Sequence, residues 1–236
     1  MTQMQSKTTG DDAQFGAAAM DPETRNLPSV FPREMGPNTM KYLQEVVKSG
    51  LKSDLYSRFC STLAEMHGVK HCIGAPGCTQ ALFATFLAMD FQPGDEIIFS
   101  PIADYGTLAG ALIENYIPVF ADTELGTAHI SAETIAPCLT DRTRAIVVVH
   151  MLGMPCDMDP IMELAEQRGL VVIEDLCQSI LARYKGRLCG TLGHVGCFSF
   201  DAEKTCGGDI GGASITNDDE IAARISNRAL ARGAKR

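Results

Sequence analysis

The sequence predicts an α/β fold, a three-layer sandwich in which a mostly parallel sheet is covered by helices on both faces. Short apolar segments alternate with segments of helical periodicity along most of the chain, and parallel strands need such a helical crossover between them. The expected strands are apolar, as is typical of strands buried on both faces. With 236 residues, 45% of them hydrophobic, the chain can bury a substantial core.

The expected elements start after a polar leader. Residues 1–26 are polar, small and aperiodic, which indicates a flexible N-terminal segment, and residues 27–236 are expected to form one large domain. Helices are expected at 38–50 and 53–68, because apolar residues recur there at helical spacing and each segment ends in glycine.

Strands and helices then alternate. Strands are expected at 71–75, 95–101, 117–122, 144–151, 170–176 and 196–200. Helices are expected at 78–89, 106–115, 131–139 and 158–169. Ligands bind at the carboxyl ends of the strands in such sheets, so the residues that directly follow a strand are the candidates for function.

Composition excludes several functional classes. The formal net charge of -9 argues against an electrostatic grip on nucleic acid or on an anionic membrane. No apolar run reaches the roughly 20 residues of a membrane span, and the first residues contain no apolar core of a secretory signal. A cytoplasmic protein is therefore expected.

The cysteines and histidines do not form a metal motif. The nine cysteines are an odd set without a C-x-x-C pair, which favours reduced, small buried residues over a disulfide framework or a zinc site. His67 and His71 have i, i+4 spacing, but Gly68 breaks any helix between them. No metal site is expected.

The segment "GAPGCTQALFATFLAM" leads from an expected strand into a helix. Gly74 and Gly77 precede a helix that begins near Cys78 and Thr79, and the free N–H groups of that helix terminus suit a phosphate monoester. The alternative is an ordinary glycine turn in which Thr79 is the N-cap. The segment matches neither a P-loop nor a dinucleotide-binding glycine fingerprint.

The strand "VVIEDL" ends in adjacent carboxylates. Glu174 and Asp175 follow apolar residues, and a buried carboxylate needs a cation or several hydrogen-bond donors. One interpretation is a structural salt bridge to Arg183 or Arg187. The other is a carboxylate directed at a protonated ring nitrogen of a cofactor, with Gln178 donating to another ring substituent.

A lysine and an aromatic residue complete the candidates. Lys204 follows the strand that ends at Ser199, where a lysine can act as an amine nucleophile, and Tyr105 follows the strand expected at 95–101. Each alone is more typical of a structural role. Together, a phosphate cradle, a carboxylate, an aromatic ring and a lysine at one sheet edge fit pyridoxal 5'-phosphate.

Longer segments carry a family resemblance. They are "KSGLKSD", "GCTQAL", "FQPGDEIIFSP", "PVFAD", "RTRAIVVVHMLGMPCDMDPI", "GLVVIEDLCQSILARYKGRLCGTLGHVGCFSF" and "GGASITND". From about Phe31 onward the chain resembles the DegT/DnrJ/EryC1/StrS family of sugar aminotransferases, within the fold-type-I pyridoxal-phosphate superfamily. The resemblance implies an aspartate-aminotransferase-like large domain that binds pyridoxal 5'-phosphate over 27–236.

The resemblance also implies residue roles. Lys204 would be the Schiff-base lysine and Asp175 the partner of the pyridinium nitrogen, while Gln178 would bind the phenolic oxygen and Tyr105 would stack on the ring. An amino acid, glutamate or glutamine, would give its nitrogen to a keto sugar nucleotide in a ping-pong reaction. Lys204 favours amino transfer over dehydration, because the related sugar dehydratases carry histidine there. A homodimer is implied as well.

The phosphate would be held by Cys78, Thr79 and Ser199. Cys78 stands where the family commonly has glycine, so a side chain must be tolerated near the phosphate.

Family members continue into a small carboxy-terminal domain, which is expected to be absent here. The chain is then expected to assemble the cofactor pocket and an incomplete substrate pocket. It would be a truncated enzyme, half of a split enzyme completed by a partner chain, or a cofactor-binding regulatory or scaffold relative with little activity. An NAD-binding protein is disfavoured, because the glycine fingerprint is lacking.

Overall fold

A seven-stranded sheet lies at the centre of the structure, a computed structural model that describes residues 36–229. The strands are β1 His71–Ala75, β2 Glu96–Phe99, β3 Ile117–Phe120, β4 Thr143–Val149, β5 Val171–Asp175, β8 Val195–Ser199 and β9 Gly212–Thr216. Their order is β1-β9-β8-β5-β4-β2-β3, and among these seven only β9 is antiparallel to its neighbours. The predicted mostly parallel sheet is confirmed. The segment 1–26 lies outside the described residues.

The helices connect the strands as the periodicity predicted. They are α1 Thr39–Lys48, α2 Leu55–His67, α3 Cys78–Ala88, α4 Tyr105–Ile113, α5 Ala132–Ile135, α6 Met158–Arg168 and α7 Asp219–Ala229. Short 3-10 turns follow at Ala136–Cys138 and Met151–Gly153, and a hairpin joins β6 Arg183–Tyr184 to β7 Arg187–Leu188. The expected helix at 131–139 is thus shorter than predicted. Strand β9, helix α7 and the hairpin were not predicted.

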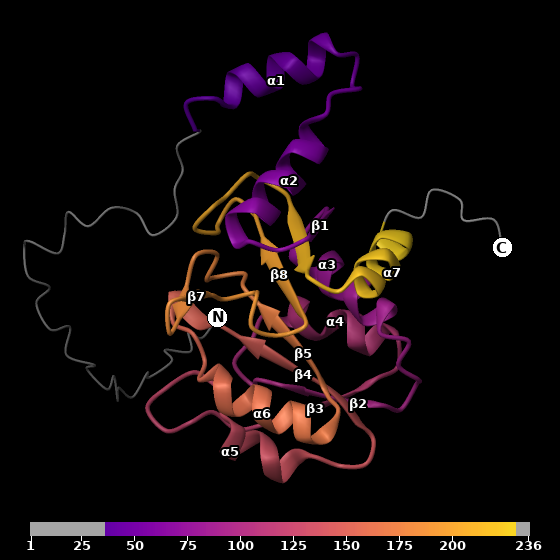
Figure 1. The fold of residues 1–236 in the computed structure, drawn as a ribbon, viewed down its shortest axis with the longest axis vertical. Helices are drawn as coiled ribbons and strands as arrows, with labels where there is room; N and C mark the ends of the chain where they lie inside the picture. Colours follow the sequence, from indigo (N-terminus) through magenta and orange to yellow (C-terminus); the bar gives the residue numbers. More distant parts are fainter. Residues whose placement is uncertain (1–35, 230–236) are drawn as a thin grey trace, which may run out of the picture. The chain divides into compact units, whose positions relative to one another are not determined.

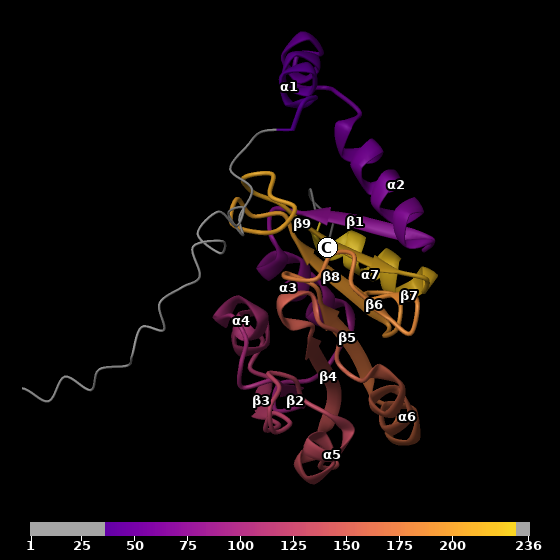
Figure 2. The ribbon, with the colours of Figure 1, turned by 90° about the vertical axis from the view of Figure 1, so that its left-hand side faces the viewer.

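Helices cover both faces of the sheet, and each face has its own core (Figures 1 and 2). Helices α3, α4 and α7 contribute to one core, and α2, α5 and α6 to the other. Along β5, Val172 belongs to the core of α5 and α6, whereas Ile173 belongs to the core of α3 and α4. Because side chains alternate along a strand, Glu174 and Asp175 also point to opposite faces.

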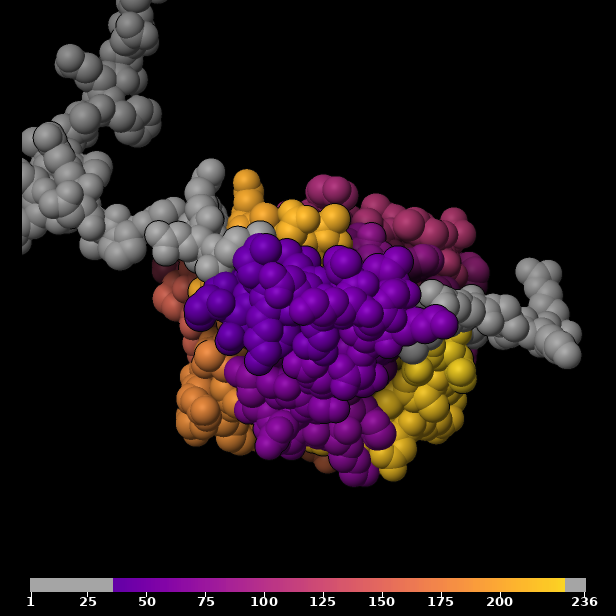
Figure 3. Space-filling model, turned by 90° about the horizontal axis from the view of Figure 1, so that it is seen from above, coloured from indigo at the N-terminus to yellow at the C-terminus, as the bar shows by residue number. Residues whose placement is uncertain are grey.

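Helix α1 contains no buried residue. Its apolar residues include Met40 and Val47, whose side chains are 65% and 74% exposed. Helices α1 and α2, in indigo and purple, occupy the centre of the face seen in Figure 3. Since packing of an apolar face supplies most of a helix's stability, α1 gains little from the described part of this chain.

All nine cysteines lie within the described residues and are free thiols, but only four of them are buried as predicted. Cys78, Cys156, Cys189 and Cys197 are buried, and Cys206 is exposed. Helix α2 ends where Gly68 adopts a left-handed conformation (φ 65°), which separates His67 from His71 as expected. None of the helices in residues 36–229 is both long and apolar enough to cross a membrane.

Cys60 of α2 is expected to be a reactive thiol. The hydrogen bond from Cys72 lowers its pKa to about 6, helped by the Gly74 backbone and the Tyr56 hydroxyl and opposed by burial. The thiolate is the nucleophile, so the rate of alkylation by iodoacetamide at Cys60 should rise with pH through a midpoint near 6. Peptide mass spectrometry measures this rate site by site.

The variant Cys72→Ala is the matched control, because it removes the donor and should move the midpoint for Cys60 upward. A midpoint that Cys72→Ala leaves unchanged would contradict the assigned cause.

Candidate active site

A cavity of about 380 Å³ lies where strands of the sheet end. Strands β1, β2, β5 and β8 run in the same direction, so the segments that follow them meet at one edge. The lining includes five of the predicted site residues, which are Cys78, Thr79, Tyr105, Ser199 and Lys204. Residues far apart in the sequence are thereby brought together, as the sequence predicted.

The amino end of α3 forms one wall of the cavity. Gly77 is the N-cap of this helix, and no side chain caps it. The N–H groups of the first turn have no partner within the helix and are therefore available to an anion. The alternative in which Thr79 is the N-cap is wrong, because Thr79 lies inside the first turn.

A close backbone approach holds this terminus in place. In the sheet, Gly212 of β9 lies between Ala75 and Ser199. A Cβ atom on Gly212 would lie 2.3 Å from the carbonyl carbon of Gly77 and 2.6 Å from the nitrogen of Cys78. Only glycine allows this contact, so β9 positions the start of α3.

Asp175 is 1% exposed and is hydrogen-bonded to two residues that line the cavity, Thr107 and Cys177. Its Oδ2 accepts a hydrogen bond from Thr107 Oγ1 at 2.8 Å, and its Oδ1 accepts one from the Cys177 backbone N–H at 3.0 Å. Within residues 36–229, no Lys, Arg or His side chain forms an ion pair with it. Asp175 is therefore a buried carboxylate with donors but without a cation.

The predicted alternative of a salt bridge to Arg183 or Arg187 is wrong. Arg187 pairs with Asp159 at 2.9 Å, and Arg183 donates to the backbone carbonyl of Gly186. Both arginines belong to the small hairpin and are exposed to solvent. Neither forms an ion pair with a carboxylate at the end of β5.

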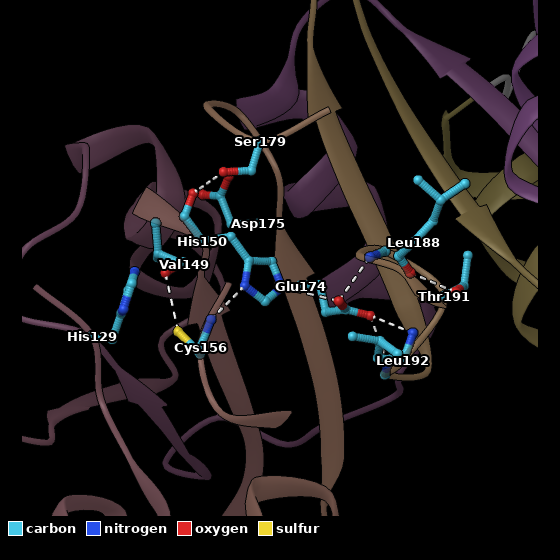
Figure 4. A network of polar contacts seen from close by, with 12 residues as sticks. His129, Val149, His150, Cys156, Glu174, Asp175, Ser179, Leu188, Thr191 and Leu192 are labelled. Atoms are coloured by element: carbon cyan, nitrogen blue, oxygen red, sulfur yellow. Dashed lines mark hydrogen bonds and ion pairs between the residues drawn. The ribbon is translucent and has the colours of Figure 1, made fainter. Parts of the chain in front are cut away.

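Glu174 is fully buried on the opposite face (Figure 4). His150 Nδ1 accepts from the Cys156 N–H, so the ring proton lies on Nε2, which donates to Glu174 at 3.0 Å. The backbone N–H groups of Gly190, Leu192 and Gly193 donate to the same carboxylate at 2.6–2.8 Å. Glu174 thus joins the ends of β4 and β5 to the turn before β8.

Lys204 lies in the turn after β8, partly buried in the cavity wall. Its backbone N–H donates to the carbonyl of Asp201, and the hydroxyl of Ser199 accepts from the Asp201 N–H at 3.4 Å. These contacts hold the lysine and Ser199 at the same end of the strand. The positive charge of Lys204 lowers the pKa of the Cys177 thiol, although other effects on this thiol are larger.

Cys78 and Cys177 are neighbours in the cavity wall. The hydrogen bond to Cys177, together with burial, raises the pKa of Cys78. For Cys177 the hydrogen bond from Cys78 lowers the pKa, but burial and the charge of Asp175 outweigh it and raise the pKa. Because both pKa values are raised, both thiols are protonated at neutral pH.

The remaining predicted residues lie at the margins of the cavity. The side chain of Tyr105 is 81% exposed at the rim. Gln178 is not part of the lining, and its amide oxygen accepts from the Leu152 N–H at 3.1 Å. The structure thus brings six predicted residues together, five in the lining and Asp175 hydrogen-bonded to it, and directs Gln178 to a neighbouring loop.

The sequence analysis missed several residues of the site, among them Asp104, Thr107 and Cys177. Asp104 is the N-cap of α4, where its side chain accepts from the Gly106 N–H at 2.8 Å, and Thr107 binds Asp175. An aspartate ahead of an apolar helical run is an N-cap signal that could have located the start of α4. The contact of Thr107 with a strand 68 residues away has no signal in a single sequence.

The groups around the cavity fit pyridoxal 5'-phosphate. A helix terminus without a capping side chain suits its phosphate, a buried carboxylate without a cation suits its ring nitrogen, and a lysine amine suits its aldehyde. The fold and the cavity therefore define an α/β protein with the architecture of a pyridoxal-phosphate-dependent transferase.

The comparisons with known proteins identify the family. Residues 33–233 match the model of the DegT/DnrJ/EryC1/StrS aminotransferase family, and the chain belongs to this family. The chain is similar to the X-ray structure of the aminotransferase from Psychrobacter cryohalolentis, with a TM-score of 0.79 and 34% sequence identity. The similarity covers 83% of this chain and 51% of that chain. The predicted aspartate-aminotransferase-like fold is confirmed.

Similar proteins of known name support this family assignment. The chain is 35% identical over 193 residues to the spore coat polysaccharide biosynthesis protein SpsC of Bacillus subtilis (strain 168), which is 81% of this chain and 50% of that protein. It is 38% identical over 165 residues to a UDP-N-acetyl-3-dehydro-alpha-D-glucosamine 3-aminotransferase of Acidithiobacillus ferrooxidans, which is 69% of this chain and 44% of that protein. The chain spans about half the length of the curated relatives it matches.

Substitution of Glu174 tests the network of Figure 4. Glu174→Ala leaves four donors without their acceptor, three of them in buried hydrogen bonds, and we expect the free energy of unfolding to fall by at least about 3 kcal/mol. Denaturant unfolding measures the loss. Asp159→Ala removes exposed ion pairs and should have a much smaller effect. Equal losses in the two variants would contradict the role of Glu174.

Substitution of Gly212 tests the backbone contact at α3. Gly212→Ala forces the Gly77 backbone to shift, and we expect a loss of about 1–3 kcal/mol in unfolding free energy together with weaker phosphate-ester binding. The control is Gly208→Ala, whose added Cβ would meet its nearest atom, the Phe200 carbonyl oxygen, at 3.7 Å. Unfolding curves and fluorescence titration with pyridoxal 5'-phosphate measure both effects. Unchanged behaviour of Gly212→Ala would refute the contact.

Proposed function

We propose that the chain is the cofactor-binding part of a pyridoxal-phosphate-dependent aminotransferase. It would transfer an amino group from an amino acid, glutamate or glutamine, to a keto sugar nucleotide in a ping-pong reaction. The observation that supports this most is the conjunction of Lys204, the buried Asp175 and the open terminus of α3 around one cavity. No smaller set of these groups would suit a cofactor with a phosphate, an aldehyde and a ring nitrogen.

Residues 27–236 would form the cofactor-binding large domain. The phosphate would be held by the first N–H groups of α3, the Thr79 hydroxyl and the hydroxyl of Ser199, beside Cys78. Asp175 would hold the ring nitrogen in its protonated form, because the buried carboxylate has no ion-pair partner among the described Lys, Arg and His side chains. When bound, the cofactor supplies the electron sink that amino transfer requires.

Lys204 would have two tasks. Its amine lines the cavity, where it would attach the cofactor covalently, and once released by the donor's amino group it would hold and return the proton of the substrate carbon. Thr107 donates a hydrogen bond to the carboxylate of Asp175 and holds it in place. This carboxylate would therefore not need to reorient during the reaction.

Tyr105 and Gln178 are proposed to contact the cofactor ring. Tyr105 starts α4 at the cavity rim, where its exposed ring would cover a flat ligand. Gln178 would have to exchange its contact with Leu152 for one with the phenolic oxygen. Ordering of both side chains would therefore accompany cofactor binding.

The proposed substrates and partners rest on the relatives. A relative 38% identical to this chain is named for amino transfer to a UDP-linked dehydro sugar, which supports a keto sugar nucleotide as acceptor. The lysine at position 204 favours amino transfer over dehydration. Helices α1 and α2 expose apolar residues, and a second copy of the chain or a partner chain would cover them.

The test is covalent trapping of the cofactor. The purified chain is mixed with pyridoxal 5'-phosphate, its visible absorption is recorded, and the adduct is reduced with borohydride and mapped by peptide mass spectrometry. We expect a visible band and a modified peptide that contains Lys204. Lys204→Ala should lose both while keeping its fold.

The control is Lys185→Ala, which removes an exposed lysine that pairs with Asp159 at 2.6 Å. It should bind and trap the cofactor like the original chain. Trapping at another lysine in the original chain, or the absence of any band in folded protein, would contradict the proposal.

A further inference from the structure

A pair of thiols and a carboxylate meet at the cavity. The Sγ atoms of Cys78 and Cys177 and a carboxylate oxygen of Asp175 all lie within 4.8 Å of one another. Each residue comes from a different place, namely the first turn of α3, the end of β5 and the segment just after β5. The cluster is therefore a product of the tertiary structure.

We propose that these three residues bind a thiophilic divalent cation of the Zn²⁺ class when the cofactor is absent. Thiolate sulfur is a preferred ligand of such ions, whereas Mg²⁺ and Ca²⁺ prefer oxygen. Zinc binds sulfur at about 2.3 Å and carboxylate oxygen at about 2.0–2.2 Å, so tetrahedral ligand atoms lie roughly 3.5–3.8 Å apart. The three ligand atoms, which lie within 4.8 Å of one another, are close to that spacing.

The surroundings favour an ion at this place. Asp175 is a buried carboxylate without an ion-pair partner among the described Lys, Arg and His side chains, so a bound cation would compensate its charge. Thr107 and the Cys177 N–H each donate to one carboxylate oxygen, which orients the group and leaves lone pairs for the ion. This is the supporting hydrogen bonding that metal ligands usually have.

The cavity supplies both access and a fourth position. Cys78 and Cys177 line it, so an ion can enter from the same side as the cofactor and keep a water molecule there. Binding converts both thiols to thiolates and releases their protons to solvent, while no group is oxidised or reduced. The charges of the ion, the two thiolates and Asp175 sum to minus one, near the amine of Lys204.

Cysteine at position 78 makes the site. Without its sulfur, only Cys177 and Asp175 would remain, which is too few protein ligands for a zinc site. If the proposed function holds, the ion and the cofactor exclude each other, because both need Asp175 and the space at the start of α3. The ion would then control how much of the protein carries cofactor.

The binding test uses Cd²⁺, whose thiolate complexes absorb in the ultraviolet, added to the reduced, metal-free and cofactor-free chain. We expect one equivalent to produce the thiolate band, and a large excess of Zn²⁺ to diminish it by competition. Cys78→Ser and Cys177→Ser should each lose the band, and Thr107→Val should weaken the affinity by about 10-fold or more.

Cys60→Ser is the matched control, since it removes one thiol of a separate adjacent pair, Cys60 and Cys72. It should keep the band. Loss of the band in Cys60→Ser together with its retention in Cys78→Ser would assign the ion to the other pair and overturn the proposal, as would the absence of any band. Circular dichroism of each variant confirms that it is folded.

A second measurement separates this proposal from the proposed function. Protein loaded with Zn²⁺ should trap pyridoxal 5'-phosphate at Lys204 more slowly than metal-free protein, and a chelator should restore the rate. Trapping that Zn²⁺ leaves unchanged would overturn mutual exclusion. A thiolate band in protein that never traps the cofactor would refute the proposed function and still support the ion site.

Discussion

Strand β5, in the middle of the sheet, ends in two adjacent carboxylates, Glu174 and Asp175. The site depends on which hydrogen-bond donors each carboxylate receives. Glu174 points to the face of α5 and α6, where four donors, one from His150 and three from the backbone, fully occupy its oxygens. Asp175 points to the face of α3 and α4 and receives hydrogen bonds from Thr107 and the Cys177 backbone. One carboxylate therefore fixes the loops, and the other keeps its charge for a ligand.

The cavity gathers groups of opposite electrostatic character because parallel strands end at one edge. The positive end of the α3 dipole and Lys204 line the cavity, and the carboxylate of Asp175 is bound to Thr107 and Cys177 of the same lining. A ligand with a phosphate and a protonated ring nitrogen complements this arrangement at both ends. The same carboxylate, placed beside the thiols of Cys78 and Cys177, also suits a soft cation. Both proposed ligands would bind Asp175, which has no ion-pair partner among the described Lys, Arg and His side chains.

Much of the fold was predictable, and the omissions share a cause. Buried parallel strands such as β4 and β5 read as apolar runs, and α2 and α6 end in left-handed glycines that mark their boundaries. Strand β9 begins at Gly212 and is rich in small residues, so its sequence does not resemble a strand. It forms because β1 and β8 on either side make hydrogen bonds to its backbone, and no local sequence pattern indicates this pairing.

The sequence by itself determined which residues follow the strands, and therefore that Cys78, Tyr105, Asp175, Ser199 and Lys204 belong to one edge of a sheet. Side-chain alternation is a local property, and the alternation of apolar strands with helices along the chain indicates parallel strands. Only the tertiary structure decided that Thr107 binds Asp175, that Cys78 meets Cys177 and that Glu174, not Asp175, holds the loops. These contacts join residues distant along the chain, and packing selects them.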